Sequence, residues 1–174
     1  MRNVVQNGTS IAHVDTVAVN ASPSGNTLGA YLSARVHPMQ PLTVEAGARY
    51  DRVSWTGDRS VSPRLNAALA LGPSTTLRAA WGTYYQAQAI QDLQVQDGVS
   101  TFYGAERAEH RVVGIEHGAG AVSLRAEAYQ RVLTHQRPRF ANLDRTIDIF
   151  PEVENDRVLL KPQGGDARGV ELFA

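Results

Sequence analysis

The chain has 174 residues, with 17 Lys plus Arg and 17 Asp plus Glu, so its formal net charge is zero. This balance gives no electrostatic reason to expect nucleic acid or an acidic substrate as a partner. The lack of cysteine excludes disulfides and thiolate metal sites. No segment approaches the roughly 18 consecutive apolar residues of a membrane helix, so crossing a bilayer would require the strands of a barrel.

Apolar and polar residues alternate with period 2 along most of the chain, which predicts strands rather than helices. The first 25 residues are ambiguous, because Ile11–Val19 fits a strand, an outer loop or both. The first clear strand is expected to break at Pro38, since proline cannot donate to a ladder. In chain order, the predicted strands are Asn26–His37, Leu42–Ser54, Val61–Leu71, Thr76–Tyr85, Ala108–His117, Ala121–Val132 and Asp166–Ala174.

The connections between these segments alternate between the two ends of the predicted strands, and their lengths differ between the two ends. Three short turns are expected on one side, at 38–41, 72–75 and 118–120. The other side has two long polar stretches, Gln86–Ala105 and Leu133–Gly165, together with one short break at 55–59. Short turns at one rim and long loops at the other are typical of outer-membrane barrels.

The fold class follows from strand length and from the residues on the apolar face. The predicted strands are about 9–13 residues long, near the roughly 9–11 that a tilted strand needs to cross a bilayer. The apolar face is rich in alanine, which is too small to fill a soluble core densely. We therefore predict an all-β fold, an antiparallel up-and-down transmembrane β-barrel segment of about seven strands. A soluble β-sandwich binding domain has the same alternation and stays an alternative.

The polar face has charged residues in mid-strand. In a barrel this face would point to a wet lumen, because Arg or Lys facing lipid at the midplane costs roughly 2–4 kcal/mol. The residues assigned to this lumenal wall are Glu45, Arg49, Arg64, Arg78, Glu116, Arg125, Glu127 and Glu171. Arg111 falls in the opposite register, and we expect it near the outer rim, where lipid phosphates can pair with it. Trp81 and Tyr85 share the apolar face and are expected in an interfacial aromatic belt.

Several segments resemble the barrel of TonB-dependent outer-membrane receptors. Leu42–Asp51 resembles a recurrent strand of that family that ends in Gly-x-Arg-Tyr-Asp, and Ser62–Leu65 with Leu77–Tyr85 resembles the next hairpin. Glu106–His117 is similar to a strand of the form Glu-Arg-x-x-x-Tyr-Glu-x-Gly, and Ala167–Leu172 to one of the form small-x-Gly-Val-Glu. The order and spacing of these motifs are more specific than any one of them.

The resemblance covers residues 26–174 and implies part of a 22-stranded barrel, with residues 1–25 as an uncertain outer loop or strand. It implies a bacterial outer-membrane protein that is not an enzyme and that imports a scarce siderophore, cobalamin or glycan with TonB-coupled energy. The implied partners are outer-membrane lipid, a small-molecule or metal-chelate ligand and, through a plug outside this chain, a TonB-type coupling protein. Both ends are expected to be truncated. A passive porin-like or structural barrel is the alternative.

No catalytic constellation and no metal-ligand spacing stands out, so we expect neither a cofactor nor a metal. The candidate ligand-contacting loop contains His135, Arg137 and Arg139, within the second long polar stretch. Other charged residues of the long stretches, including Asp92 and Asp97, are expected to be solvated.

Overall fold

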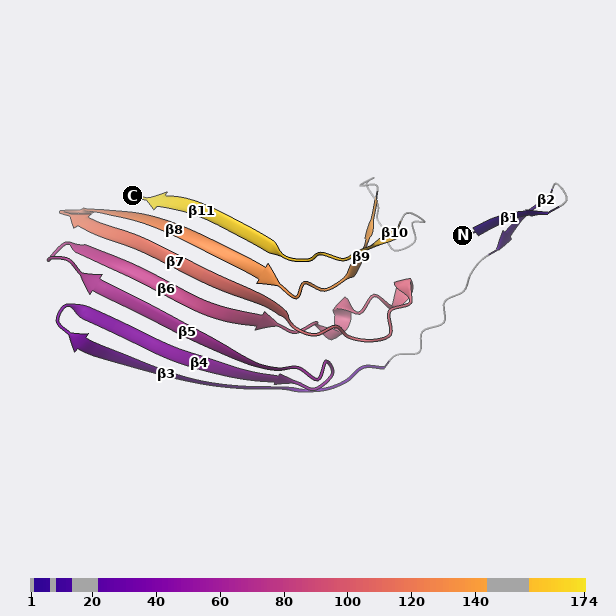
Figure 1. The fold of residues 1–174 in the computed structure, drawn as a ribbon, viewed down its shortest axis with the longest axis horizontal. Helices are drawn as coiled ribbons and strands as arrows, with labels where there is room; N and C mark the ends of the chain where they lie inside the picture. Colours follow the sequence, from indigo (N-terminus) through magenta and orange to yellow (C-terminus); the bar gives the residue numbers. More distant parts are fainter. Residues whose placement is uncertain (1, 7–8, 14–21, 144–156) are drawn as a thin grey trace.

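The structure, a computed structural model, describes residues 2–6, 9–13, 22–143 and 157–174. Seven antiparallel strands form the main sheet, a single curved layer (Figure 1). None of the helical segments in the described part of the chain is long and apolar enough to cross a membrane. The strands of the main sheet are β3 (Thr27–Met39), β4 (Leu42–Val53), β5 (Arg59–Ala70), β6 (Thr75–Gln86), β7 (Glu106–Ala119), β8 (Val122–Thr134) and β11 (Gly165–Phe173).

Strands that follow one another in the chain are neighbours in the main sheet, in the order β11-β8-β7-β6-β5-β4-β3. The turns after β3, β5 and β7 meet at one end of the sheet, and the longer connections lie at the other end (Figure 1). The predicted seven strands and their up-and-down order are therefore confirmed. We call the two ends of the sheet the short-turn end and the long-loop end.

Two small hairpins lie outside the main sheet. β1 (Arg2–Gln6) pairs with β2 (Thr9–His13) in the region that the sequence left ambiguous, and residues 14–19 of the possible strand lie outside the described part. β9 (Arg139–Asn142) pairs with β10 (Arg157–Leu160) within the second long stretch, where the sequence predicted no strand. These strands of four residues are too short to show a clear alternation.

The prediction that the first long strand breaks at Pro38 is wrong. β3 continues through Pro38 to Met39, and its pairing with β4 shifts register between Val36 and Met39. In the described sheet β3 is an edge strand. A proline is tolerated at an edge or at an irregularity of the ladder, where its missing N–H breaks no pairing.

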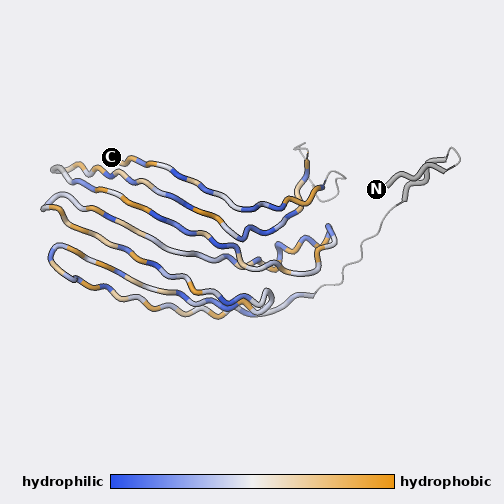
Figure 2. The backbone as a smooth tube through the Cα atoms, in the orientation of Figure 1, coloured by the Kyte–Doolittle hydropathy of each residue, from blue (hydrophilic) through white to orange (hydrophobic). Residues whose placement is uncertain are grey.

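Pairing in register sorts the side chains of the main sheet into rows of like character. One row crosses all seven strands and consists of Val36, Val44, Ala67, Ala79, Val113, Ala128 and Val170. A neighbouring row on the other face consists of Thr43, Ala68, Arg78, Gly114, Glu127 and Glu171. We call these two sides the apolar face and the charged face. Figure 2 shows the resulting alternation of hydrophobic and hydrophilic residues along the strands.

The apolar face is not covered by a second layer. Among the residues whose exposure the structure describes, the only buried apolar side chains are Val53 and Leu93, each 8% exposed. On the apolar face Leu32 is 79% exposed and Leu172 is 78% exposed. A soluble domain buries such a face against another layer, so the β-sandwich alternative does not fit the main sheet.

Expressed alone in water, the chain should aggregate instead of folding as a monomer, because it exposes an apolar face and the edges of β3 and β11. Size-exclusion chromatography with light scattering should show large assemblies in detergent-free buffer. The same chain in detergent micelles is the control and should be dispersed. A monomer with a sharp, cooperative melt in the absence of detergent would contradict this expectation.

Candidate functional site

All eight residues assigned from the sequence to a lumenal wall lie on the charged face. They come from six different strands and are Glu45, Arg49, Arg64, Arg78, Glu116, Arg125, Glu127 and Glu171. The structure therefore brings together on one surface residues that lie up to 126 positions apart in the chain. The period of 2 fixes this arrangement, since one register assignment decides the face of every residue in a strand.

Charges on the charged face compensate one another across neighbouring strands. The Arg35 guanidinium bonds to Glu45 with 2.6 Å between Nη2 and Oε2, and the corresponding Nη2–Oε2 distance from Arg78 to Glu116 is 3.0 Å. The guanidinium of Arg64 lies 4.7 Å from the centre of the Tyr84 ring, a cation–π distance. This surface is a polar wall with ion pairs and a cation–π contact between neighbouring strands.

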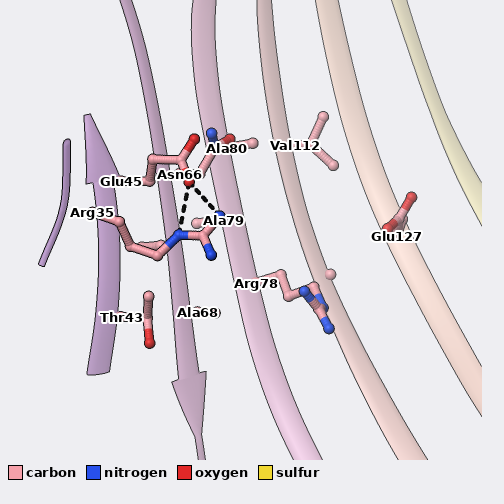
Figure 3. Close-up of a pocket in the computed structure, with 12 residues that line it drawn as sticks. Arg35, Thr43, Glu45, Asn66, Ala68, Arg78, Ala79, Ala80, Val112 and Glu127 are labelled. Carbon is pink, nitrogen blue, oxygen red and sulfur yellow. Dashed lines mark hydrogen bonds and ion pairs between the residues drawn. The ribbon is translucent and has the colours of Figure 1, made fainter. Parts of the chain in front are cut away.

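The charged face is hollowed across six strands, from β3 to β8. A cavity of about 450 Å³ lies between the pair Arg35–Glu45 on one side and Arg78 with Glu127 on the other (Figure 3). Gly114 lies under the Glu127 side chain, and a Cβ at this glycine would come within 2.8 Å of Glu127 Cγ. The glycine therefore lets Glu127 lie flat against the sheet.

The first long loop, between β6 and β7, is organised around Gln88, which is only 5% exposed. Its side-chain Nε2 donates to the carbonyl of Asp92 at 3.0 Å, and its Oε1 accepts from the backbone N–H of Tyr103 at 2.9 Å. Its own carbonyl accepts from the indole Nε1 of Trp55 at 2.8 Å, from the neighbouring β4–β5 turn. One glutamine thus joins both halves of this loop to the adjacent turn.

Two contacts fasten the first long loop to the β9–β10 hairpin. The side-chain amide of Gln94 donates to the carbonyl of Phe140 at 3.0 Å and accepts from its N–H at 2.7 Å. Asp97 binds Arg157 in bidentate fashion, with 2.6 Å between Nε and Oδ1, and these side chains are 7% and 12% exposed. The expectation that Asp97 is solvated is therefore wrong, because its partner lies 60 residues further along the chain.

A cavity of about 420 Å³, which we call the loop cavity, lies between the first long loop and the segment after β8. Arg137 and Arg139 both line it, together with Tyr103. The backbone N–H of Arg137 donates to Glu106 at 3.0 Å, which fixes this segment to the start of β7. Of the three loop residues predicted to contact a ligand, His135 is not among those lining the loop cavity. It is exposed, with φ of 55°.

The match to known proteins agrees with this architecture. The family model described as TonB dependent receptor-like, beta-barrel, matches residues 2–152. The chain belongs to this family. The structure is similar to that of a mutant of the ferric enterobactin receptor PfeA of Pseudomonas aeruginosa, with a TM-score of 0.63 and 17% sequence identity. This similarity, which at such identity concerns the fold alone, covers 84% of the chain and 24% of that receptor. No curated protein matches the sequence.

As a TonB-dependent receptor barrel, the chain is an outer-membrane protein and belongs to a family of transporters, not of enzymes. It spans about a quarter of the length of the receptor it resembles. The structure places Trp81 and Tyr85 on the apolar face of this receptor barrel, each 39% exposed, and their place in an interfacial belt stays a prediction. The indole Nε1 of Trp81 donates to Glu109 at 3.1 Å.

Sequence reasoning missed the glutamines that organise the first long loop of the receptor barrel. Five occur within eleven residues, at 86, 88, 91, 94 and 96, and this density is the one signal that the sequence offers. An amide both donates and accepts, so it satisfies irregular backbone without adding charge. A polar stretch without periodicity is therefore not necessarily a loop without fixed structure.

Removing the charge at Asp97 should loosen the loop cavity while leaving the barrel strands intact. The Asp97→Asn variant removes the carboxylate that binds the largely buried Arg157 in bidentate fashion, and removing one partner of a buried pair costs about 3–5 kcal/mol. Hydrogen exchange on the intact receptor in detergent should show faster exchange at 94–97 and 139–142. Asp92→Asn is the matched control, because the Asp92 side chain is 48% exposed. Equal exchange in the two variants would refute a clamping role for Asp97.

Proposed function

We propose that this segment forms part of the wall and of the outer ligand-binding surface of an outer-membrane transporter, which imports a scarce ligand with TonB-coupled energy. The observation that supports it best is the loop cavity, built at the long-loop end of a sheet whose charged face is hollow. Loops fastened to one another by buried side-chain contacts make a defined binding surface. A passive pore, the alternative, has no need of such a surface.

The chemistry of the loop cavity suits a ligand rich in oxygen. Its lining includes Gln91 and Gln96, whose amides donate and accept, and the phenol of Tyr103. Arg139 adds an exposed guanidinium, which binds anionic oxygens in bidentate geometry. Siderophores, cobalamin and glycans all present such groups, and we retain these three classes. The match to a ferric enterobactin receptor makes a ferric catecholate the first probe.

In this proposal residues 26–174 contribute about seven strands to a larger barrel. The charged face lines the lumen and packs against a plug, and the apolar face meets the lipid of the outer membrane. The partners are then the lipid, a small-molecule or metal-chelate ligand and a TonB-type protein that acts through the plug. The lumenal cavity and the paired charges around it support this orientation, since a wet interior solvates charge and lipid does not.

The orientation can be tested with two adjacent alanines of β6. In the intact receptor, Ala79→Arg should abolish assembly, because it places a guanidinium on the apolar face at a cost of roughly 2–4 kcal/mol near the midplane. Ala80→Arg changes the neighbouring residue on the charged face and should be tolerated far better. Folded barrel in the outer membrane is measured by heat-modifiable gel mobility. Equal tolerance of both substitutions would refute the lipid-facing assignment.

Transport can be tested with ⁵⁵Fe-labelled ferric enterobactin, cobalamin and a linear oligosaccharide as probes for the intact receptor. Uptake of one of them should depend on a functional TonB-type protein, and Arg139→Ala should weaken its binding about tenfold by removing one charged hydrogen bond. Arg59→Ala, an exposed arginine away from the loop cavity, is the control. Uptake that persists without energy coupling would favour the passive pore, and uptake of none of the probes would contradict the ligand classes.

A further inference from the structure

A polar network interrupts the apolar face toward the long-loop end. Its residues lie on β6, β7, β8 and β11, and all of them share the apolar face by register. We call it the rim network, and its members are Trp81, Arg107, Glu109, Arg111, Gln130, Asp166 and Arg168. A network of polar side chains on this face needs a physical reason, because the face meets lipid in the proposed orientation.

Glu109 is the centre of the first half of the rim network. It accepts hydrogen bonds from Arg111 Nη2 at 2.6 Å, from Arg107 Nη2 at 3.1 Å and from the indole Nε1 of Trp81 at 3.1 Å. The Glu109 side chain is only 16% exposed, whereas that of Arg111 is 58% exposed. The carboxylate is therefore enclosed by its donors, and the guanidinium of Arg111 stands outside it.

Gln130 connects the two halves of the network. Arg111 Nη1 donates to its Oε1 at 3.4 Å, and its Nε2 donates to Asp166 at 2.9 Å. Asp166 in turn accepts from Arg168 Nη2 at 2.7 Å. The Arg168 side chain is 72% exposed and that of Asp166 is 41% exposed. Here too the cation is the outer member of the pair.

The charges of the rim network do not cancel. Three arginines share two carboxylates, so the network has an excess of one positive charge, and its most exposed groups are Arg111 and Arg168. An exposed ion pair such as that of Arg168 with Asp166 adds little to folding stability, typically about 0–1 kcal/mol. Stability alone is therefore a weak reason for placing this network on an apolar face.

The height of the rim network in the membrane follows from the length of β7. From Arg111, β7 continues to Ala119 at the short-turn end. Over this length the strand rises about 20 Å along the barrel axis, at about 3.3 Å per residue and a tilt of about 40°. The apolar band of an outer-membrane barrel is about 25 Å tall. Arg111 thus lies close to the outer boundary of the hydrocarbon, in one row with Trp81 and Arg168. Aromatic residues favour this interface.

We propose that the rim network is a binding site for the phosphate groups of a phosphorylated glycolipid of the outer leaflet. Guanidinium groups bind phosphate oxygens in bidentate geometry, and basic clusters at the membrane boundary bind lipid headgroups. Arg111 and Arg168 are the phosphate-binding residues, and Glu109, Gln130 and Asp166 hold them in place. This inference rests on the proposed function, since it requires the apolar face to meet lipid with the long loops outside.

The test measures binding of lipopolysaccharide to the intact receptor, purified in detergent and freed of lipid. Arg111→Gln combined with Arg168→Gln should weaken binding roughly thirtyfold, as expected for two basic residues at a charged membrane surface. Arg78→Gln is the matched control, because Arg78 is 54% exposed and ion-paired but lies on the charged face. Enzymatically dephosphorylated lipopolysaccharide should bind the wild-type receptor as weakly as intact lipopolysaccharide binds the double variant. Inorganic phosphate alone should not raise the melting temperature.

Two further variants separate phosphate binding from a purely structural role. Glu109→Gln keeps a side-chain oxygen that can accept from Arg111 and removes one negative charge, so it should keep or strengthen lipopolysaccharide binding, and weaker binding at an unchanged melting temperature would overturn the proposal. If the double glutamine variant does not assemble, Arg111→Lys with Arg168→Lys keeps the charge and should bind within a few-fold of wild type. Equal binding of intact and dephosphorylated lipopolysaccharide also overturns it, because the phosphates would then not be what is recognised. Unchanged binding by the double glutamine variant overturns it as well.

The comparison of Ala79→Arg with Ala80→Arg distinguishes a failure of the rim network proposal from a failure of the proposed function. If that comparison supports a lipid-facing apolar face and the lipopolysaccharide results are negative, only the rim network proposal is refuted. If the uptake experiment fails, the lipopolysaccharide readout is unaffected, because it requires no transported ligand.

Discussion

The in-register antiparallel pairing of seven strands is the constraint on which the rest of the structure depends. The row from Val36 to Val170, for example, is apolar in every strand of the sheet. A slip of one residue in β6 would move Arg78 to the apolar face and Ala79 to the charged face, and a slip in β8 would do the same to Glu127 and Ala128. Register therefore determines which surface is charged and which is apolar, and the cavity on the charged face follows from it.

At the long-loop end, side chains take over the role that the backbone ladder plays in the sheet. The amide of Gln94 pairs with both backbone groups of Phe140, as a neighbouring strand would. Within the first long loop, the side-chain amide of Gln88 likewise binds a backbone carbonyl, that of Asp92, and a backbone N–H, that of Tyr103. These contacts satisfy buried polar groups that have no ladder partner. A loop built in this way keeps the sides of the loop cavity at fixed positions relative to the sheet.

The sequence predicted the strands well because their signal is local. Alternation of neighbouring residues placed β7 within two residues of its observed ends, and it sorted the eight residues assigned to the lumenal wall to one face. The loop contacts had no local signal, since Asp97 and Arg157 are 60 residues apart and nothing in either segment points to the other. The rim network could be predicted from the sequence only in part. Arg111 was expected near the rim, but its partners on β8 and β11 depend on strand order as well as on pattern.

The separation of the two ends of the sheet has an evolutionary consequence. The connection from β8 to β11 runs from Thr134 to Gly165 and contains β9 and β10. Lengthening such a loop costs little, because the entropy of closing it grows only with the logarithm of its length. Residues inserted or deleted between β9 and β10 change no row of the main sheet. The proposed ligand-binding surface is therefore free to diverge between relatives, while the seven strands keep one register.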